Sequence, residues 1–233
     1  MKPTLRIAVM AGLVVIGLCT AALAQTETLK SHVAALKESL TQNRQNLKQY
    51  QWTQTTVVLH KGEEKSKKVY SAHYGPDGTI QKTEVAASPE HHPGGVRGHI
   101  IEKKKEEMVT EMKQAADMMK QYVPPEPARI QAAVNSGNAS VEMLEPGKKV
   151  RLNFRNYQKP GDTLAIDLDP SNHRLLGVNV STYMDDPKDP VALAVQFGTL
   201  PDGTTYPSET TLNLKSKDVT VVTTNSDYTK MTR

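Results

Sequence analysis

The amino-acid sequence predicts an α+β fold, in which a strongly curved antiparallel sheet of about ten strands is covered by two or three helices. Short segments rich in β-branched and aromatic residues alternate with turn-forming sequences along most of the chain. Two longer segments, 27–48 and 99–122, instead repeat apolar residues at helical spacing. A single sheet with so many strands curls rather than staying flat, which gives the helices a hollow to cover.

The first 24 residues have the composition and order of a secretory signal peptide. Two cations precede an apolar stretch at 7–18, and the small residues Ala22 and Ala24 stand where signal peptidase requires them. We therefore expect cleavage before Gln25 and a single domain over 25–233. The mature protein would be periplasmic or secreted, without a transmembrane segment.

Two other interpretations of this segment stay open. Residues 7–24 just reach the length of a membrane-spanning helix, so the segment could be an uncleaved anchor. Cys19 lies in a context that resembles the lipid-modification site of bacterial lipoproteins, although Leu18 occupies a position that favours a small residue. Cys19 is also the single cysteine of the chain, so cleavage before Gln25 would leave no thiol for disulfides, metal binding or catalysis.

Charge and aromatic content argue against a nucleic-acid partner. The formal net charge is +4, and two of the positive charges, Lys2 and Arg6, lie in the predicted signal peptide. A nucleic-acid interface needs a concentration of basic side chains that such a chain lacks. Aromatic residues make up 5% of the sequence, which also supplies few platforms for base stacking.

The mature chain begins with a predicted amphipathic helix at 27–48, followed by three strands. Polar residues separate the apolar ones along the helix, so a single stripe needs a partner surface. The segments 50–60, 67–74 and 79–86 are rich in strand-forming residues and are joined by Gly-containing turns. They predict a three-stranded antiparallel meander that packs on this helix. The stripe consists of Leu29, Val33, Leu36, Leu40 and Leu47.

A second amphipathic helix is predicted at about 99–122, and a short one at 128–138. Pro124 and Pro125 end the second helix, because proline cannot continue the backbone hydrogen bonding. Gly137 ends the short helix. The methionines on the second helix have flexible thioether side chains, which either fill the core or adapt to varied apolar ligands. The stripe consists of Ile101, Met108, Met112, Ala115, Met119 and Tyr122, with Met118 beside it.

From residue 139 onward the sequence predicts seven more strands. The segment 163–169 alternates apolar residues with alanine or aspartate, so one face of that strand is dry and the other is solvated. The regular spacing of the strands predicts a sheet in which sequential strands are neighbours. The seven segments are 139–144, 150–157, 163–169, 174–184, 191–200, 206–215 and 219–228.

The segment 87–98 is rich in histidine and glycine. His91 and His92 are adjacent, so in an extended chain they point to opposite sides and do not easily share a metal ion, even with His99 nearby. The glycines precede a helix but lack the spacing of nucleotide-binding loops. We interpret the segment as a flexible linker, and we expect neither a metal nor a cofactor.

No local motif indicates catalysis. Asp185, Asp186 and Asp189 form an acidic turn, but they lack the ordered ligand pattern of a calcium loop. Serine, histidine and aspartate all occur without a motif that would position them as nucleophile and base. We therefore expect a protein without enzymatic activity.

The order of the elements resembles the periplasmic lipoprotein-carrier (LolA-like) superfamily. The shared features are a signal peptide, a leading amphipathic helix, a strand meander, a proline-terminated helix in mid-chain and a long antiparallel run. The resemblance covers nearly the whole chain after residue 24, and it implies an unclosed β-barrel with helices as a lid. Because it rests on element order, no functional residue is transferred from the family.

The resemblance implies a concave apolar surface that receives acyl chains or another hydrophobic ligand. We therefore expect a carrier or binding protein for a lipid-like ligand in the bacterial cell envelope. The alternative is a module that binds an envelope protein, or senses a signal, and uses the same fold without a ligand. The ligand-contacting residues predicted on the helical lid are Ile101, Met108, Met112, Met119 and Tyr122.

Overall fold

The computed structural model describes residues 31–87 and 95–231. In α2 (Gly95–Met119), it describes the backbone alone at 95–102 and at 104. The predicted signal peptide, its alternatives and residues 88–94 of the predicted linker therefore lie outside the described residues.

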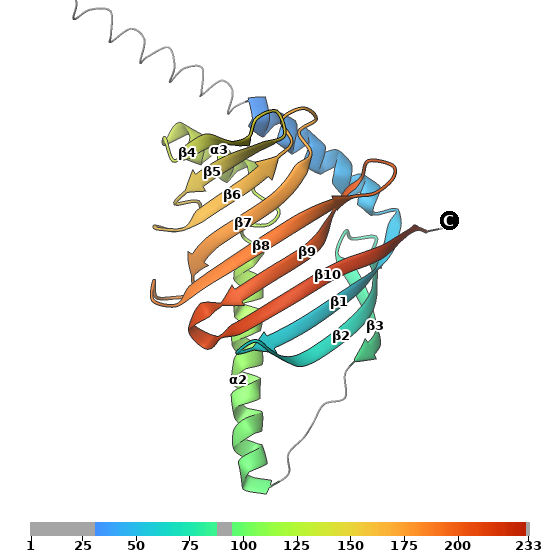
Figure 1. The fold of residues 1–233 in the computed structure, drawn as a ribbon, viewed down its shortest axis with the longest axis vertical. Coiled ribbons are helices and arrows are strands. Elements are labelled where there is room, and N and C mark those ends of the chain that lie inside the picture. Colours follow the sequence, from blue (N-terminus) through green and yellow to red (C-terminus); the bar gives the residue numbers. More distant parts are fainter. Residues whose placement is uncertain (1–30, 88–94, 232–233) are drawn as a thin grey trace, which may run out of the picture.

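The described strands form one open antiparallel sheet, which confirms the predicted fold class (Figure 1). The strand order is β3-β2-β1-β10-β9-β8-β7-β6-β5-β4. Because β3 and β4 lie at opposite ends of this order, the sheet does not close into a barrel. The strands are β1 (Tyr50–His60), β2 (Glu63–Tyr74), β3 (Ile80–Ala87), β4 (Ala139–Glu145), β5 (Lys149–Arg155), β6 (Thr163–Leu168), β7 (Leu175–Tyr183), β8 (Pro190–Thr199), β9 (Thr205–Leu214) and β10 (Val219–Lys230).

The first and last strands are neighbours in the sheet. Tyr50 of β1 lies opposite Lys230 of β10, and His60 lies opposite Val219 at the other end of the pair. All other neighbouring strands are sequential, as the strand spacing predicted. The three-stranded meander therefore joins the long C-terminal run through this one pair of strands, which the sequence analysis did not predict.

Three helices accompany the sheet in the described part of the chain. The first helix is described over 31–47, α2 crosses behind the middle strands, and α3 (Pro127–Asn135) follows it (Figure 1). α2 begins at Gly95, inside the segment predicted to be a linker. A glycine in a helix costs roughly 1 kcal/mol relative to alanine, but it does not prevent the helix. The prediction that 95–98 belong to a linker, which relied on these glycines, was therefore wrong.

The ends of the two later helices differ from the prediction by a few residues. α2 ends at Met119, because the N–H groups of 120–122 bond to carbonyls three residues back and form a tight turn before Pro124. Tyr122 therefore lies just after the helix. The short helix ends at Asn135, and Gly137 closes it in the left-handed conformation with a φ of 73°.

One face of the sheet forms the hydrophobic core. On β5, Val150, Leu152 and Phe154 are buried, and the residues between them are more exposed. Burying such a side chain stabilises the fold by roughly 1.5–3 kcal/mol, and the same pattern continues across β6, β7 and β8. The helices cover this face with buried side chains of their own, namely Leu36, Ala115, Met119, Ile130 and Ala133.

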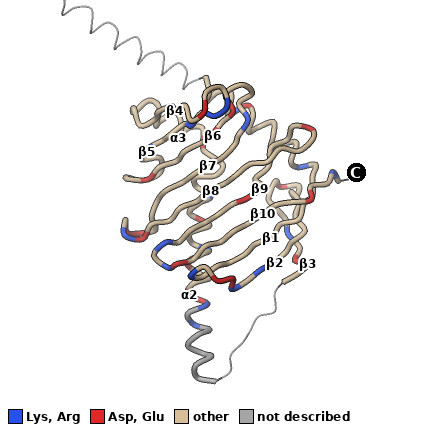
Figure 2. The backbone as a smooth tube through the Cα atoms, in the orientation of Figure 1, with Lys and Arg blue, Asp and Glu red and all other residues tan. Residues whose placement is uncertain are grey.

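The same face becomes polar where β9, β10 and β1 meet. Thr210, Thr223 and Thr56 lie in register across these three strands. On β10 and β1, Asn225 lies opposite Gln54. Lysine, arginine, aspartate and glutamate occur at strand ends, in turns, along β2 and on α2 (Figure 2). This part of the covered face is therefore polar but uncharged.

Candidate functional site

The three methionines among the predicted lid residues, Met108, Met112 and Met119, pack against the hydrophobic core. Met119 is buried in the core with 5% of its surface exposed, and Met108 and Met112 are partly buried against the same cluster. The side chain of Ile101 lies outside the described residues. The stripe thus lies on the inner surface, where its contacts are with protein, and its role in ligand binding stays a prediction.

The last predicted lid residue, Tyr122, is fully buried and anchors the end of α2. Its hydroxyl group donates a hydrogen bond to Asp162 Oδ2 at 2.6 Å and lies 2.9 Å from the hydroxyl of Thr182. Burial, followed by the hydrogen bond to Asp162, raises the pKa of Tyr122. Tyr122 is therefore a neutral hydrogen-bond donor that ties the helix to the sheet.

Asp162 organises the turn that receives this tyrosine. Its two carboxylate oxygens accept hydrogen bonds from the backbone N–H groups of Tyr157, Gln158 and Lys159, at 2.6, 3.0 and 2.9 Å. Asp162 was not among the predicted site residues. Nothing local in the sequence indicated its bond to Tyr122, which is 40 residues away.

An apolar cavity lies between the first helix and α3. Its volume is about 400 Å³, within the range of about 300–1,000 Å³ that is typical of small-molecule sites. Lys37 is the only charged residue in its lining. The cavity is therefore suited to an apolar group. The lining residues are Val33, Ala34, Leu36, Lys37 and Leu40 on the first helix, and Pro125, Pro127, Ala128, Ile130 and Gln131 on the following segment.

The sequence analysis assigned the ligand to α2 and missed this cavity. It did identify Val33, Leu36 and Leu40 as an apolar stripe that needed a partner. The strand meander was the predicted partner of this stripe. Leu47 does line a pocket with residues of the meander, whereas Val33, Leu36 and Leu40 lie beside α3, with a space between them. Helical periodicity predicts which face of a helix is buried, but it does not predict how completely the facing surface fills the contact.

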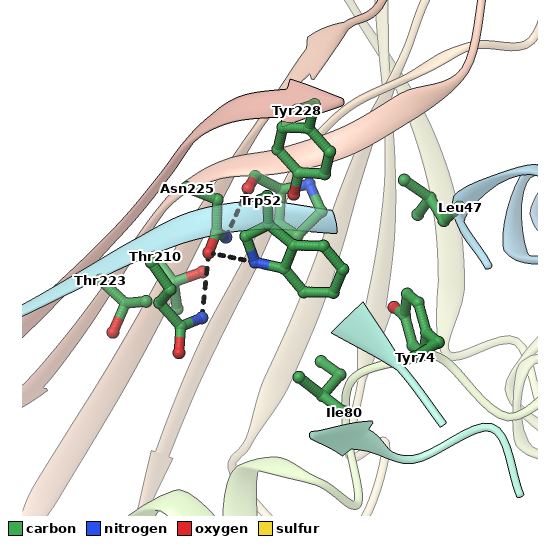
Figure 3. A pocket seen from close by; sticks show the side chains of 10 residues that line it. Leu47, Trp52, Tyr74, Ile80, Thr210, Thr223, Asn225 and Tyr228 are labelled. Carbon is green, nitrogen blue, oxygen red and sulfur yellow. Dashed lines mark hydrogen bonds between the residues drawn. The ribbon is translucent and has the colours of Figure 1, made fainter. Parts of the chain in front are cut away.

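A second pocket, of about 230 Å³, lies at the polar part of the covered face (Figure 3). Trp52 stacks on Tyr228 with ring centroids 5.4 Å apart, and Tyr74 lies tilted at 5.5 Å from the same indole. The pKa values of Tyr74 and Tyr228 are raised, mainly because both hydroxyl groups are shielded from water. None of the described residues that line this pocket is charged. They are Leu47, Trp52, Gln54, Tyr74, Ile80, Pro207, Thr210, Thr223, Asn225 and Tyr228.

Polar contacts hold the first helix against the strand ends. The side chain of Asn43 bonds the backbone of Thr205 twice: its amide donates to the carbonyl oxygen, and its Oδ1 accepts from the N–H. Nearer the start of the helix, the imidazole rings of His32 and His173 lie 5.4 Å apart. The helix that forms one wall of the apolar cavity is thus attached by groups that include a histidine pair.

Acidification is expected to weaken the attachment of the first helix. Burial, and secondly the charge of His173, lower the pKa of His32. A histidine with a lowered pKa in the folded chain takes up protons on unfolding, so its contribution to stability is lost as the pH falls below about 6.5. When the pH is lowered from about 7.5 to about 5, the melting temperature of His32→Gln should fall less than that of the unaltered protein. An identical loss in both proteins, measured by circular dichroism, would contradict the assignment.

Comparisons with known proteins gave no match among protein-family models, curated proteins or solved structures. Of the helices in the described part of the chain, none combines the length and apolar character that crossing a membrane requires. Among the side chains that the structure describes, no three of His, Cys, Asp or Glu are grouped as a metal site would require.

Proposed function

We propose that this protein is an exported, non-enzymatic carrier or binding protein for a lipid-like ligand in the bacterial cell envelope. The observation that carries the proposal is the apolar cavity of about 400 Å³ between the first helix and α3. An apolar chain gains free energy on entering such a space, because it leaves water without losing hydrogen bonds. The N-terminal sequence supports export, through its resemblance to a signal peptide.

The cavity wall combines a fixed part with a part that can adjust. Leu36 and Ile130 belong to the buried core and hold the base of the cavity. Val33 and Leu40 are only partly buried, and Ala128 is exposed at the rim. An acyl chain could therefore be received by small movements of the first helix, while the sheet and the core stay in place.

A bulky residue at the rim should block the cavity. We expect Ala128→Trp to weaken binding of a dansyl-labelled undecanoic acid at least tenfold, because the indole occupies the space that the acyl chain needs; tenfold corresponds to about 1.4 kcal/mol. Fluorescence titration, with palmitate as the competitor, measures the affinity. The matched control is Ala132→Trp, one turn further along α3, where the alanine is exposed and does not line the cavity. Equal affinities of the two variants would rule out this cavity as the site.

The alternative function is protein interaction through a free sheet edge. Large apolar side chains are exposed on both edge strands, with Val85 of β3 at 62% and Met143 of β4 at 61%. An exposed edge is a template on which another chain can add a strand. Native mass spectrometry of the protein taken from its own host separates the two functions. A co-purifying lipid supports the carrier, and a ligand-free protein favours the interaction module.

A further inference from the structure

We propose that the pocket lined by Trp52, Tyr74 and Tyr228 is a second binding site, which takes one uncharged ring bearing hydroxyl groups, such as a pyranose sugar. The inference does not depend on the lipid-like ligand, because the two sites share no lining residue. It rests on an unpaired buried acceptor, on aromatic walls and on a lining without charge.

The first observation is a buried acceptor without a partner. Gln54 has 6% of its surface exposed, and its Oε1 has no hydrogen-bond partner among the described residues. Its Nε2 is already used, because it donates to Asn225 Oδ1 at 2.9 Å. Leaving a buried acceptor unpaired costs about 1–3 kcal/mol, so this atom favours a bound group that donates a hydrogen bond.

The orientation of Gln54 follows from its neighbours. An indole N–H can only donate, so the 3.1 Å bond from Trp52 Nε1 requires that Asn225 present its oxygen (Figure 3). The amide nitrogen of Asn225 donates to the carbonyl oxygen of Pro207 at 2.8 Å, which fixes the same orientation. Since the oxygen of Asn225 faces Gln54, Gln54 must present its nitrogen there and keep its oxygen free.

The aromatic walls select the shape of the ligand. Tyr74 and Tyr228 are partly buried, and both line the pocket. The face of an aromatic ring is negative, and it attracts the weakly positive C–H groups on one side of a saturated sugar ring. The hydroxyl groups of such a ring project outward, where one can donate to Gln54 Oε1 and others can reach Thr210 or Thr223.

Charge and size narrow the ligand further. A phosphate or a carboxylate loses its hydration when it is buried, and the described lining has no cation to offset that cost. The pocket therefore disfavours anionic ligands. A volume of about 230 Å³ lies below the range of about 300–1,000 Å³ for drug-sized ligands, so the pocket holds one ring at a time. A free saccharide and the head group of a glycolipid share this chemistry.

The single tryptophan of the chain reports directly on the pocket, because Trp52 is that tryptophan. Methyl glucoside and methyl N-acetylglucosaminide should each be titrated while its fluorescence is recorded. We expect a saturable change with at least one of them. Octyl glucoside, used below its micelle concentration, then shows whether the ligand is a free saccharide or the head group of a glycolipid. Equal affinity for methyl and octyl glucosides identifies the ring as the recognised group, and binding of the octyl compound alone overturns the proposal.

The matched variants are Gln54→Met and Gln51→Met, on the same strand. Gln54→Met removes the acceptor while keeping the shape of the side chain, and it should weaken sugar binding about tenfold. Gln51 is exposed outside the pocket, so Gln51→Met should bind as the unaltered protein does. If Gln54→Met fails to fold, Thr210→Val removes another hydrogen-bonding group from the pocket lining. We expect this variant to lower the sugar affinity a few-fold.

Two results would overturn the assignment. One is the absence of a saturable response of Trp52 to every pyranose tested up to millimolar concentration. The other is a crystal structure, grown with the sugar, in which only a water molecule bonds to Gln54 Oε1. Sugar binding should be unaffected in Ala128→Phe, which fills the rim of the apolar cavity without adding a second tryptophan, so failure of this site and failure of the apolar cavity can be told apart.

Discussion

Replacing Asp162 with alanine is expected to lower the free energy of unfolding by about 3–5 kcal/mol, because each buried donor that loses its acceptor costs about 1–3 kcal/mol. The substitution leaves the hydroxyl of Tyr122 and three backbone N–H groups without their acceptor. These donors are largely shielded from water, so solvent replaces the lost bonds poorly. Urea unfolding, followed by circular dichroism, measures the change.

The control for this prediction is Asp77→Ala. Asp77 also accepts hydrogen bonds from a turn, through the N–H and hydroxyl of Thr79, but it is exposed. We expect it to cost less than about 1 kcal/mol, because water can satisfy the freed groups. Similar losses in the two variants would mean that Asp162 acts only as a turn residue, and that Tyr122 does not anchor α2.

Replacing Met119 with aspartate is expected to destabilise the protein by about 2.5–6 kcal/mol. The change removes a buried apolar side chain, worth about 1.5–3 kcal/mol, and places a carboxyl group in the hydrophobic core, at a further cost of about 1–3 kcal/mol. Met112, by contrast, is only partly buried, so Met112→Asp should unfold at a higher urea concentration than Met119→Asp.

This comparison decides whether α2 is a fixed wall or a loosely held lid. Met119→Leu serves as the control, since leucine has a similar volume and should cost less than about 1.5 kcal/mol. If Met119→Asp were as stable as the unaltered protein, its side chain would have to reach water. The end of α2 would then open easily, as a lid does.

Most of the fold was predictable from local patterns. All ten strands were identified, because strand-forming segments bounded by Gly, Pro and Asp turns are recognisable over a few residues. The buried stripe on α2 was also identified, because helical periodicity records which face is covered. The helix ends were less accurate, since they depend on turns and caps at single residues.

The candidate sites were much less predictable, because they depend on contacts between distant segments. Gln54 and Asn225 meet across 171 residues of sequence, and only the pairing of β1 with β10 brings them together. The apolar cavity likewise arises where α3 incompletely covers the first helix. Neither feature leaves a local pattern, so the sequence supported a hydrophobic ligand on α2 but indicated neither pocket.

The pairing of β1 with β10 has a consequence for when the molecule can fold. β1 can gain its second neighbour only after β10, near the C-terminus, has been synthesised. Contacts between such distant segments form slowly, since a long loop of chain must close before they add stability. Until β10 is available, β1 presents an unpaired edge, so the two parts of the sheet join late in folding.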